Sequence, residues 1–185
     1  MNSKGIIYSG LTKKGKKILI RYPKITDTES ILNYFNTLSK EKTYIRFQGE
    51  RLTLKEEEKY MRDILKKIKE NRVVKLLAFI SDKLVGVADI KMQEKIETHV
   101  GIFGITVAKE FRGEGIGKLL LKLAIEEAKK KIKDLEIVTL GCFANNQAAC
   151  TMYKNFGFIE YGNLPEGVKH KREYVDHLYF YKKIR

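Results

Sequence analysis

The chain is poor in cysteine, histidine and proline. Of its 185 residues, two are cysteine, three are histidine and two are proline. Two cysteines do not build a disulfide framework, and the cysteines and histidines lie too far apart to show the spacing of a metal site. No linker or repeat is evident, so one domain over residues 1–185 is expected. These absences exclude a disulfide-stapled module and favour a protein without a metal.

Long apolar runs are also missing. No stretch reaches the length of a membrane span, and the N-terminus lacks the apolar run of a signal peptide. We therefore expect a cytoplasmic protein with no membrane partner. The net charge of +14 attracts anions such as nucleic acid or a phosphate-rich cofactor. Many lysines fit a solvated helix face, and no recognition-helix or aromatic-strand motif is present, so no specific nucleic-acid partner is predicted.

Hydrophobic periodicity predicts a mixed α/β sheet with helices on its faces. Strands are expected over residues 17–22, 73–81, 84–92, 98–107 and 136–142, with one or two more ending near Tyr181. Helices are expected near residues 26–39, 53–68, 115–131 and 146–156, the first two behind capping-box signatures at Thr26 and Thr53. Residues 1–15 indicate an N-terminal hairpin or arm. The elements do not alternate strictly enough for a doubly wound dinucleotide fold.

The most informative stretch is Arg112-Gly113-Glu114-Gly115-Ile116-Gly117, between a predicted strand and a predicted helix. Glycines let a backbone approach a ligand closely, and a helix start offers unpaired N–H groups to an anion. The even glycine spacing excludes the G-x-G-x-x-G dinucleotide fingerprint. A Walker P-loop would need glycine in place of Arg112 and Ser or Thr in place of Leu119. The remaining pattern, Arg-x-x-Gly-x-Gly, can also serve backbone geometry alone.

A second block runs from Asn146 to Phe158, with Ala149 three residues and Tyr153 seven residues after the asparagine. The two blocks together resemble the GNAT superfamily of N-acetyltransferases, and the resemblance covers roughly residues 73–160. It implies a single GNAT-type domain with about four helices and a mixed, mostly antiparallel sheet of about seven strands, splayed between strands four and five. It further implies transfer of an acetyl group from acetyl-CoA to a primary amine, by direct attack in a ternary complex.

The resemblance also implies where acetyl-CoA binds. The pantetheine arm would lie between strands four and five, against the backbone of Ile105, Thr106 and Val107. The pyrophosphate would lie on the backbone amides of Arg112, Gly113, Glu114, Gly115, Ile116, Gly117 and Lys118. Two roles stay open for Arg112, which either contacts the cofactor or braces the loop. Asn146 likewise contacts the cofactor, caps the helix that follows it, or does both.

Acetyl transfer needs a neutral amine, a stabilised oxyanion and a proton for the leaving thiolate. The resemblance maps Tyr153 onto the residue that usually protonates the CoA sulfur. A phenol is protonated at neutral pH, although Tyr153 also lies on an apolar helical stripe that fits a core. Cys150 as a nucleophile is disfavoured, because no histidine is near it in sequence and a residue of this kind is usually a buried small hydrophobe.

The general base is not evident. Relatives often place a glutamate in strand four, whereas residues 101–104 supply no carboxylate. The nearest substitutes are Glu94, Glu97 and His99, of which His99 is chemically best suited near neutral pH. A water chain is the alternative. The missing carboxylate also supports a second hypothesis, a non-catalytic CoA-binding sensor or scaffold of the same fold.

The acceptor is expected to be a small-molecule amine or a peptide N-terminus. Residues 25–70 and the C-terminal strands would select it, but neither carries an interpretable code. The N-terminal arm and the last strands are candidates for pairing subunits in a homodimer.

Overall fold

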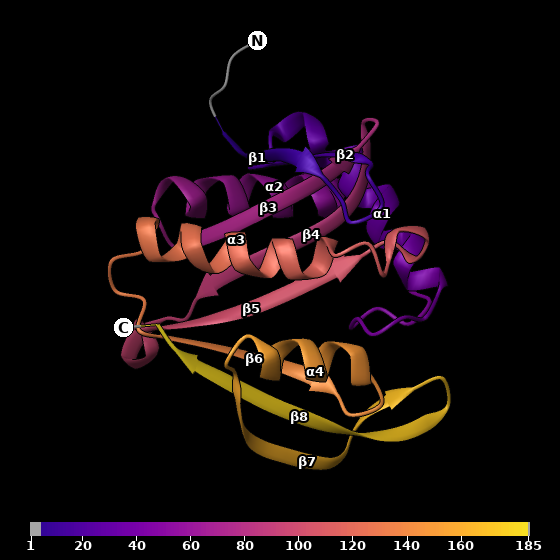
Figure 1. Ribbon diagram of the computed structural model, residues 1–185, viewed down its shortest axis with the longest axis vertical. Coiled ribbons are helices and arrows are strands. Elements are labelled where there is room, and N and C mark those ends of the chain that lie inside the picture. Colours follow the sequence, from indigo (N-terminus) through magenta and orange to yellow (C-terminus); the bar gives the residue numbers. More distant parts are fainter. Residues whose placement is uncertain (1–4, 185) are drawn as a thin grey trace.

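The computed structural model describes residues 5–184, and its centre is an eight-stranded sheet (Figure 1). The sheet order is β1-β2-β3-β4-β5-β6-β8-β7, and all neighbours are antiparallel except β5 and β6. The strands are β1 (Ile6–Leu11), β2 (Lys17–Arg21), β3 (Val73–Ile80), β4 (Lys83–Met92), β5 (Val100–Val107), β6 (Ile137–Phe143), β7 (Ile159–His170) and β8 (Glu173–Lys183). Seven strands were expected; the eighth is β1, which pairs with β2 as a hairpin.

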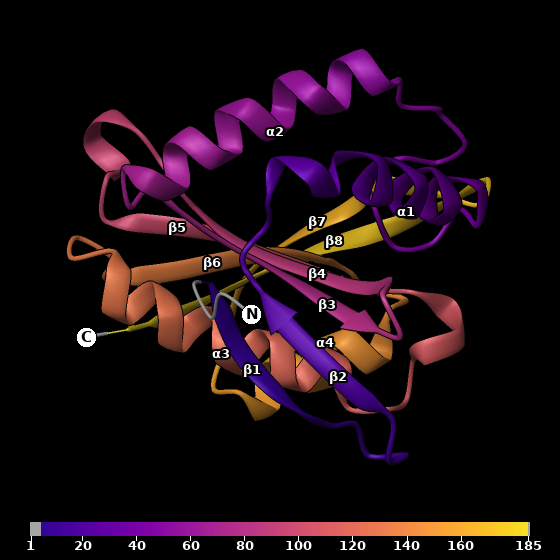
Figure 2. The ribbon, with the colours of Figure 1, turned by 90° about the horizontal axis from the view of Figure 1, so that it is seen from above.

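Helices cover both faces of the sheet (Figure 2). One face carries α1 (Thr28–Lys40) and α2 (Leu54–Lys69), and the other carries α3 (Ile116–Lys131) and α4 (Gln147–Asn155). Every residue of β3 is buried, because helices cover the sheet on both faces. A strand in such a position is expected to be almost entirely apolar. Short 3-10 turns cover Ile25–Asp27, Lys95–Glu97 and Lys109–Phe111. Among the described residues, no helix has the length and apolar character that crossing a membrane requires.

The two predicted capping boxes have different outcomes. At α2, the Glu56 carboxylate accepts a hydrogen bond from the Thr53 backbone N–H at 2.8 Å, and the Glu56 N–H donates to Thr53 Oγ1 at 3.4 Å. The prediction of a capping box at Thr26 is wrong. Asp27 instead accepts two hydrogen bonds from Arg21, both at 2.7 Å. Because this tertiary ion pair occupies the carboxylate, α1 begins at Thr28 without a side-chain cap.

The parallel strands β5 and β6 pair only at their beginnings. Val100, Gly101 and Ile102 are matched with residues 137–139, and no later pair exists in the described chain. Beyond these positions the two strands diverge (Figure 1). β5 then leads into the glycine-rich loop and α3, whereas β6 leads into α4. The splay expected between the fourth and fifth of seven strands is therefore confirmed. With the additional strand β1 counted, these two strands are β5 and β6, and each leads into one of the two sequence blocks.

Candidate active site

Glycine makes the turn of the loop at residues 112–117 possible. Gly113 and Gly115 have φ angles of +77° and +82°, in the left-handed region that a residue with a Cβ rarely enters. Gly115 is the N-cap residue of α3. None of the backbone N–H groups of residues 113–118 donates a hydrogen bond to another described residue, as expected in the first turn of a helix. A row of free donors at the positive end of α3 is therefore available to an anion.

The side chain of Glu114 ties this loop to the β1–β2 hairpin. Its carboxylate is buried and accepts hydrogen bonds from Lys16 Nζ at 2.6 Å and Thr12 Oγ1 at 3.0 Å. The Lys13 backbone N–H donates to the Glu114 carbonyl at 3.1 Å. The hydrogen bond from Lys16 lowers the pKa of Glu114. The carboxylate thus binds the hairpin, and of the polar groups of Glu114 only the backbone N–H is left without a partner in the described part of the chain.

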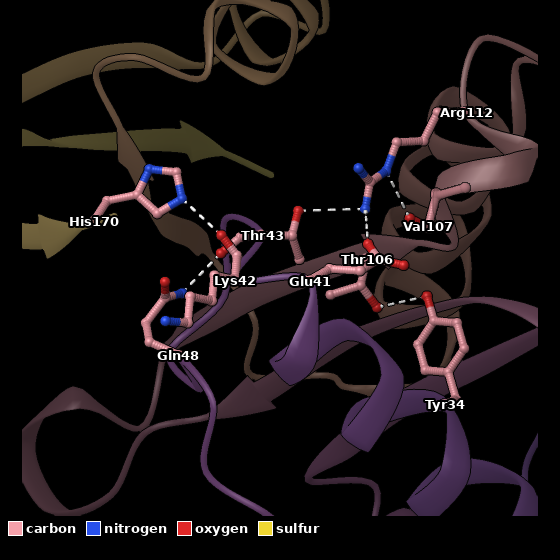
Figure 3. A network of polar contacts seen from close by, with 9 residues as sticks. All are labelled: Tyr34, Glu41, Lys42, Thr43, Gln48, Thr106, Val107, Arg112 and His170. Atoms are coloured by element: carbon pink, nitrogen blue, oxygen red, sulfur yellow. Dashed lines mark hydrogen bonds and ion pairs between the residues drawn. The ribbon is translucent and has the colours of Figure 1, made fainter. Parts of the chain in front are cut away.

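Arg112 braces the other side of the loop (Figure 3). Its Nε donates to the Val107 carbonyl at 3.0 Å. One terminal nitrogen lies 3.3 Å from Thr43 Oγ1 and 3.4 Å from Glu41 Oε2. The guanidinium therefore links the end of β5 to the segment between α1 and α2. Two roles were left open for Arg112, and these contacts favour the one in which its side chain holds the loop in place.

The segment between α1 and α2, residues 41–53, also reaches the C-terminal strands. The Lys42 carbonyl lies 2.9 Å from Nε2 of His170 on β7 (Figure 3). The ring of Tyr44 lies 4.8 Å from that of His170 and 5.9 Å from that of Phe143 on β6. This segment is thus held both at the β5 side and at the β6–β8 side of the splay. Its role in selecting the acceptor stays a prediction.

Helix α4 places the second sequence block beside β5. The Tyr153 side chain is 6% exposed and lies edge-on to Phe103 of β5, with ring centroids 6.3 Å apart. Burial raises the pKa of Tyr153, so its phenol is protonated. Asn146 Oδ1 accepts a hydrogen bond from the Ala149 N–H at 3.3 Å. Asn146 therefore caps α4, and its contact with the cofactor stays a prediction.

His99 immediately precedes β5, next to the positions where β5 and β6 are still paired. Its carbonyl accepts hydrogen bonds from the N–H groups of Glu136 and Ile137, at 2.9 and 3.2 Å. The splayed part of β5 lies beyond the three paired positions. The catalytic role of His99 stays a prediction. Cys150 is buried, with its sulfur 3.3 Å from that of Cys142, as expected for a thiol packed in the core.

Sequence reasoning missed a buried ion pair on the face covered by α1 and α2. Lys75 of β3 is 1% exposed, and its Nζ lies 3.0 Å from Asp89 Oδ2 of β4 and 3.4 Å from the Tyr60 hydroxyl of α2. A signal was available, because a lone lysine inside an apolar central strand needs a buried partner. Across β4 and β5, Asp89 is matched with Gly104, so this pair lies next to the splayed strand.

The comparison with known families decides the class of the protein. The sequence model described as the acetyltransferase (GNAT) family matches residues 35–158, which is more than half of the chain. The chain belongs to the GNAT acetyltransferase family. The resemblance of the two sequence blocks to the GNAT superfamily is thereby confirmed.

Individual relatives agree with this assignment. The L-amino acid N-acetyltransferase AaaT of Escherichia coli (strain K12) is 29% identical over 108 residues, which are 58% of this GNAT chain and 66% of the relative. The chain thus spans just under two thirds of that relative's length. A GNAT-family acetyltransferase structure from Streptococcus pneumoniae has a TM-score of 0.82 and 27% identity, covering 91% of this chain and 99% of the other. The fold of yncA from Salmonella typhimurium, solved with its cofactor acetyl-CoA, is similar, with a TM-score of 0.78, 15% identity and coverage of 91% and 94%.

Proposed function

We propose that this protein moves the acetyl group of acetyl-CoA to a primary amine by direct attack in a ternary complex. The observation that carries the proposal is the parting of β5 and β6 immediately before the free amides at the start of α3. The pantetheine arm would lie along β5, against the backbone of Ile105, Thr106 and Val107, in the way that an added strand uses an exposed edge. The amides of residues 113–118 would then hold the pyrophosphate.

Tyr153 is the proposed donor of the proton to the leaving thiolate. It approaches β5 at Phe103, the first residue beyond the paired positions. A pantetheine arm that runs from the loop toward the paired ends of β5 and β6 would place its sulfur near Phe103. A protonated phenol there supplies the general acid that the departing sulfur needs.

The acceptor class that fits best is an amino acid or a short peptide with a free N-terminal amine. Aromatic rings gather at the β6–β8 side of the splay: Tyr44, Phe143, His177 and Tyr179. Such rings suit an apolar side chain next to the amine. The relative AaaT, by its name, acts on L-amino acids, which supports the same class.

A thiol-release assay tests this function. Wild-type protein is incubated with acetyl-CoA and, separately, L-phenylalanine, spermidine or an alanine-initiated peptide, and the acceptor is then weighed by mass spectrometry. We expect CoA release together with an acetylated amine. N-acetyl-L-phenylalanine is the matched control, because its amine is blocked. Stabilisation by acetyl-CoA without release to any amine would contradict the proposal and favour a CoA-binding sensor.

A further inference from the structure

Gly104 of β5 and Gly141 of β6 each lie two residues beyond the last position at which these strands pair. The parallel register matches Val100 with Ile137 and Ile102 with Thr139. Continued past the last pair, that register sets Gly104 opposite Gly141. Both positions lie on the sheet face covered by α1 and α2, since alternate residues such as Phe103 and Leu140 belong to the core beneath α3 and α4. Neither strand therefore places a side chain of its own at this point.

A carboxylate from the neighbouring strand occupies the space at Gly104. A Cβ added at Gly104 would lie 3.4 Å from Asp89 Oδ1. The other oxygen, Oδ2, lies 3.0 Å from Lys75 Nζ and 3.6 Å from Lys91 Nζ. No described residue donates a hydrogen bond to Oδ1. The two lysines thus fix one oxygen of Asp89, while the other points toward the splayed strand and lacks a donor.

A second carboxylate on the same face also has an oxygen without a donor. Glu57 of α2 is 5% exposed, and its Oε1 has no hydrogen-bond partner among the described residues. Burial raises the pKa of Glu57, and the charges of Lys75 and Lys91 oppose that rise, so Glu57 lies within electrostatic reach of the same lysines. A buried acceptor without a partner is unfavourable. Asp89 Oδ1 and Glu57 Oε1 are therefore two acceptors on this face that N–H groups of a ligand could use.

A histidine occupies the equivalent space at Gly141. The ring of His177, on β8, lies over Gly141, where any Cβ would collide with its Nε2. The Phe143 and Tyr179 rings lie 6.1 and 4.5 Å from it, between centroids. Burial lowers the pKa of His177, so the imidazole is neutral at neutral pH. A neutral imidazole can accept a proton.

We propose that Asp89 and His177 are the acceptor-side residues of this reaction, in which Asp89 Oδ1 binds the acceptor's ammonium group and His177 Nε2 takes its proton. The assignment rests on the proposed function. Tyr153 approaches from the opposite face at the adjacent residue of β5. The acceptor and the proton donor for the sulfur would thus reach the thioester from different sides.

The atoms balance as follows. The ammonium gives one proton to His177, and the resulting amine attacks the thioester carbonyl, forming the N–C bond. His177 passes this proton to solvent and takes the second proton of the nitrogen as the C–S bond breaks, and the thiolate gains a proton from Tyr153. One proton is returned to Tyr153 and one leaves to solvent. The products are the acetylated amine and CoA, and no further reactant is needed.

Steady-state kinetics with the best acceptor among L-phenylalanine, spermidine and an alanine-initiated peptide test the assignment. Asp89→Asn removes a charged hydrogen bond and is expected to raise the acceptor KM about tenfold to hundredfold. Because Asp89→Asn leaves Lys75 buried without its counter-charge, the double variant Lys75→Met/Asp89→Asn serves as a second, folded form. Asp63→Asn is the matched control, an exposed aspartate of α2 paired with Lys67. Its KM should be unchanged.

His177 is tested in the same assay. His177→Gln is expected to lower kcat by about a hundredfold or more while acetyl-CoA binding is retained. Free imidazole should restore part of the activity of His177→Ala, which a merely structural role would not allow. A larger loss in His99→Gln than in His177→Gln would overturn the assignment. So would Asp89 and His177 variants that lower only the melting temperature and leave KM and kcat unchanged. Absence of CoA release from the wild type would contradict the proposed function and this assignment together, whereas wild-type turnover with unaffected variants would contradict this assignment alone.

Discussion

Replacing glycine by alanine should destabilise the protein at one position of the loop and not at another, two residues away. Gly115 has a φ of +82°, and an L-residue in that region costs about 1–2 kcal/mol. A Cβ there would also lie 3.0 Å from Lys13 Cγ, but Lys13 is exposed and its side chain can move away. The backbone term therefore decides, and Gly115→Ala should lower the melting temperature by roughly 2–8 °C in a chain of this size.

Gly117 lies in the first turn of α3. A Cβ there would meet Met152, Val107 and Ile105 at 3.7–3.9 Å, which is ordinary van der Waals contact. Alanine is favoured over glycine in a helix by up to about 1 kcal/mol, so Gly117→Ala should leave the melting temperature unchanged or raise it. The Gly117→Ala variant should bind acetyl-CoA with unchanged affinity. The Gly115→Ala variant should bind it more weakly, because backbone strain shifts the amides of the loop.

The measurements are thermal unfolding without ligand and calorimetric titration with acetyl-CoA. Gly113→Ala is the control, because Gly113 has a φ of +77° and nothing within 4 Å of an added Cβ. It isolates backbone strain from contact with Lys13. Equal melting temperatures for Gly115→Ala and Gly117→Ala would refute the reasoning, and so would undiminished acetyl-CoA affinity in Gly115→Ala.

Three further predictions concern single side chains. Tyr153→Phe keeps the buried ring and removes the hydroxyl, so acetyl-CoA affinity should be retained while kcat falls about 10²- to 10⁴-fold; an unchanged kcat would remove Tyr153 from the mechanism. Arg112→Lys cannot reproduce the forked contacts with Val107 and residues 41–43, and the acetyl-CoA KM measured by CoA release should rise; equal KM values would show that the brace does not position the loop. Thr53→Ala removes the N-cap of α2 and should lower the unfolding free energy by about 1 kcal/mol in denaturant titrations, with kcat/KM unchanged; a fall in activity at equal stability would contradict a purely local role.

Much of the fold could be predicted from the sequence because its signals are local. The apolar run of β3, the glycine turn before α3 and the asparagine that caps α4 each leave a mark within a few residues. The failures arose where a distant partner decides the outcome. The capping box at Thr26 is replaced by the ion pair of Asp27 with Arg21. The short strand β1 is held by its pairing with β2, which its own sequence only suggests.

The same difference between local and distant signals applies to the candidate site. The backbone groups proposed for the cofactor lie in one continuous stretch, so a motif could point to them. Asp89 and His177 come from β4 and β8, and they flank the splay only because Gly104 and Gly141 leave space for them. A search for a carboxylate among the residues of β5 could not find Asp89, which lies on β4 and is matched with Gly104 of β5.

The most direct test of the central claim is an amide NMR titration of the wild-type protein with acetyl-CoA. If the start of α3 binds the pyrophosphate and the splay receives the pantetheine arm, the N–H resonances of residues 113–118 and of the splayed residues 103–107 should shift together. Resonances of the β1–β2 strands away from the loop should stay in place. Shifts confined to exposed lysines, with the loop and β5 amides unmoved, would contradict the account.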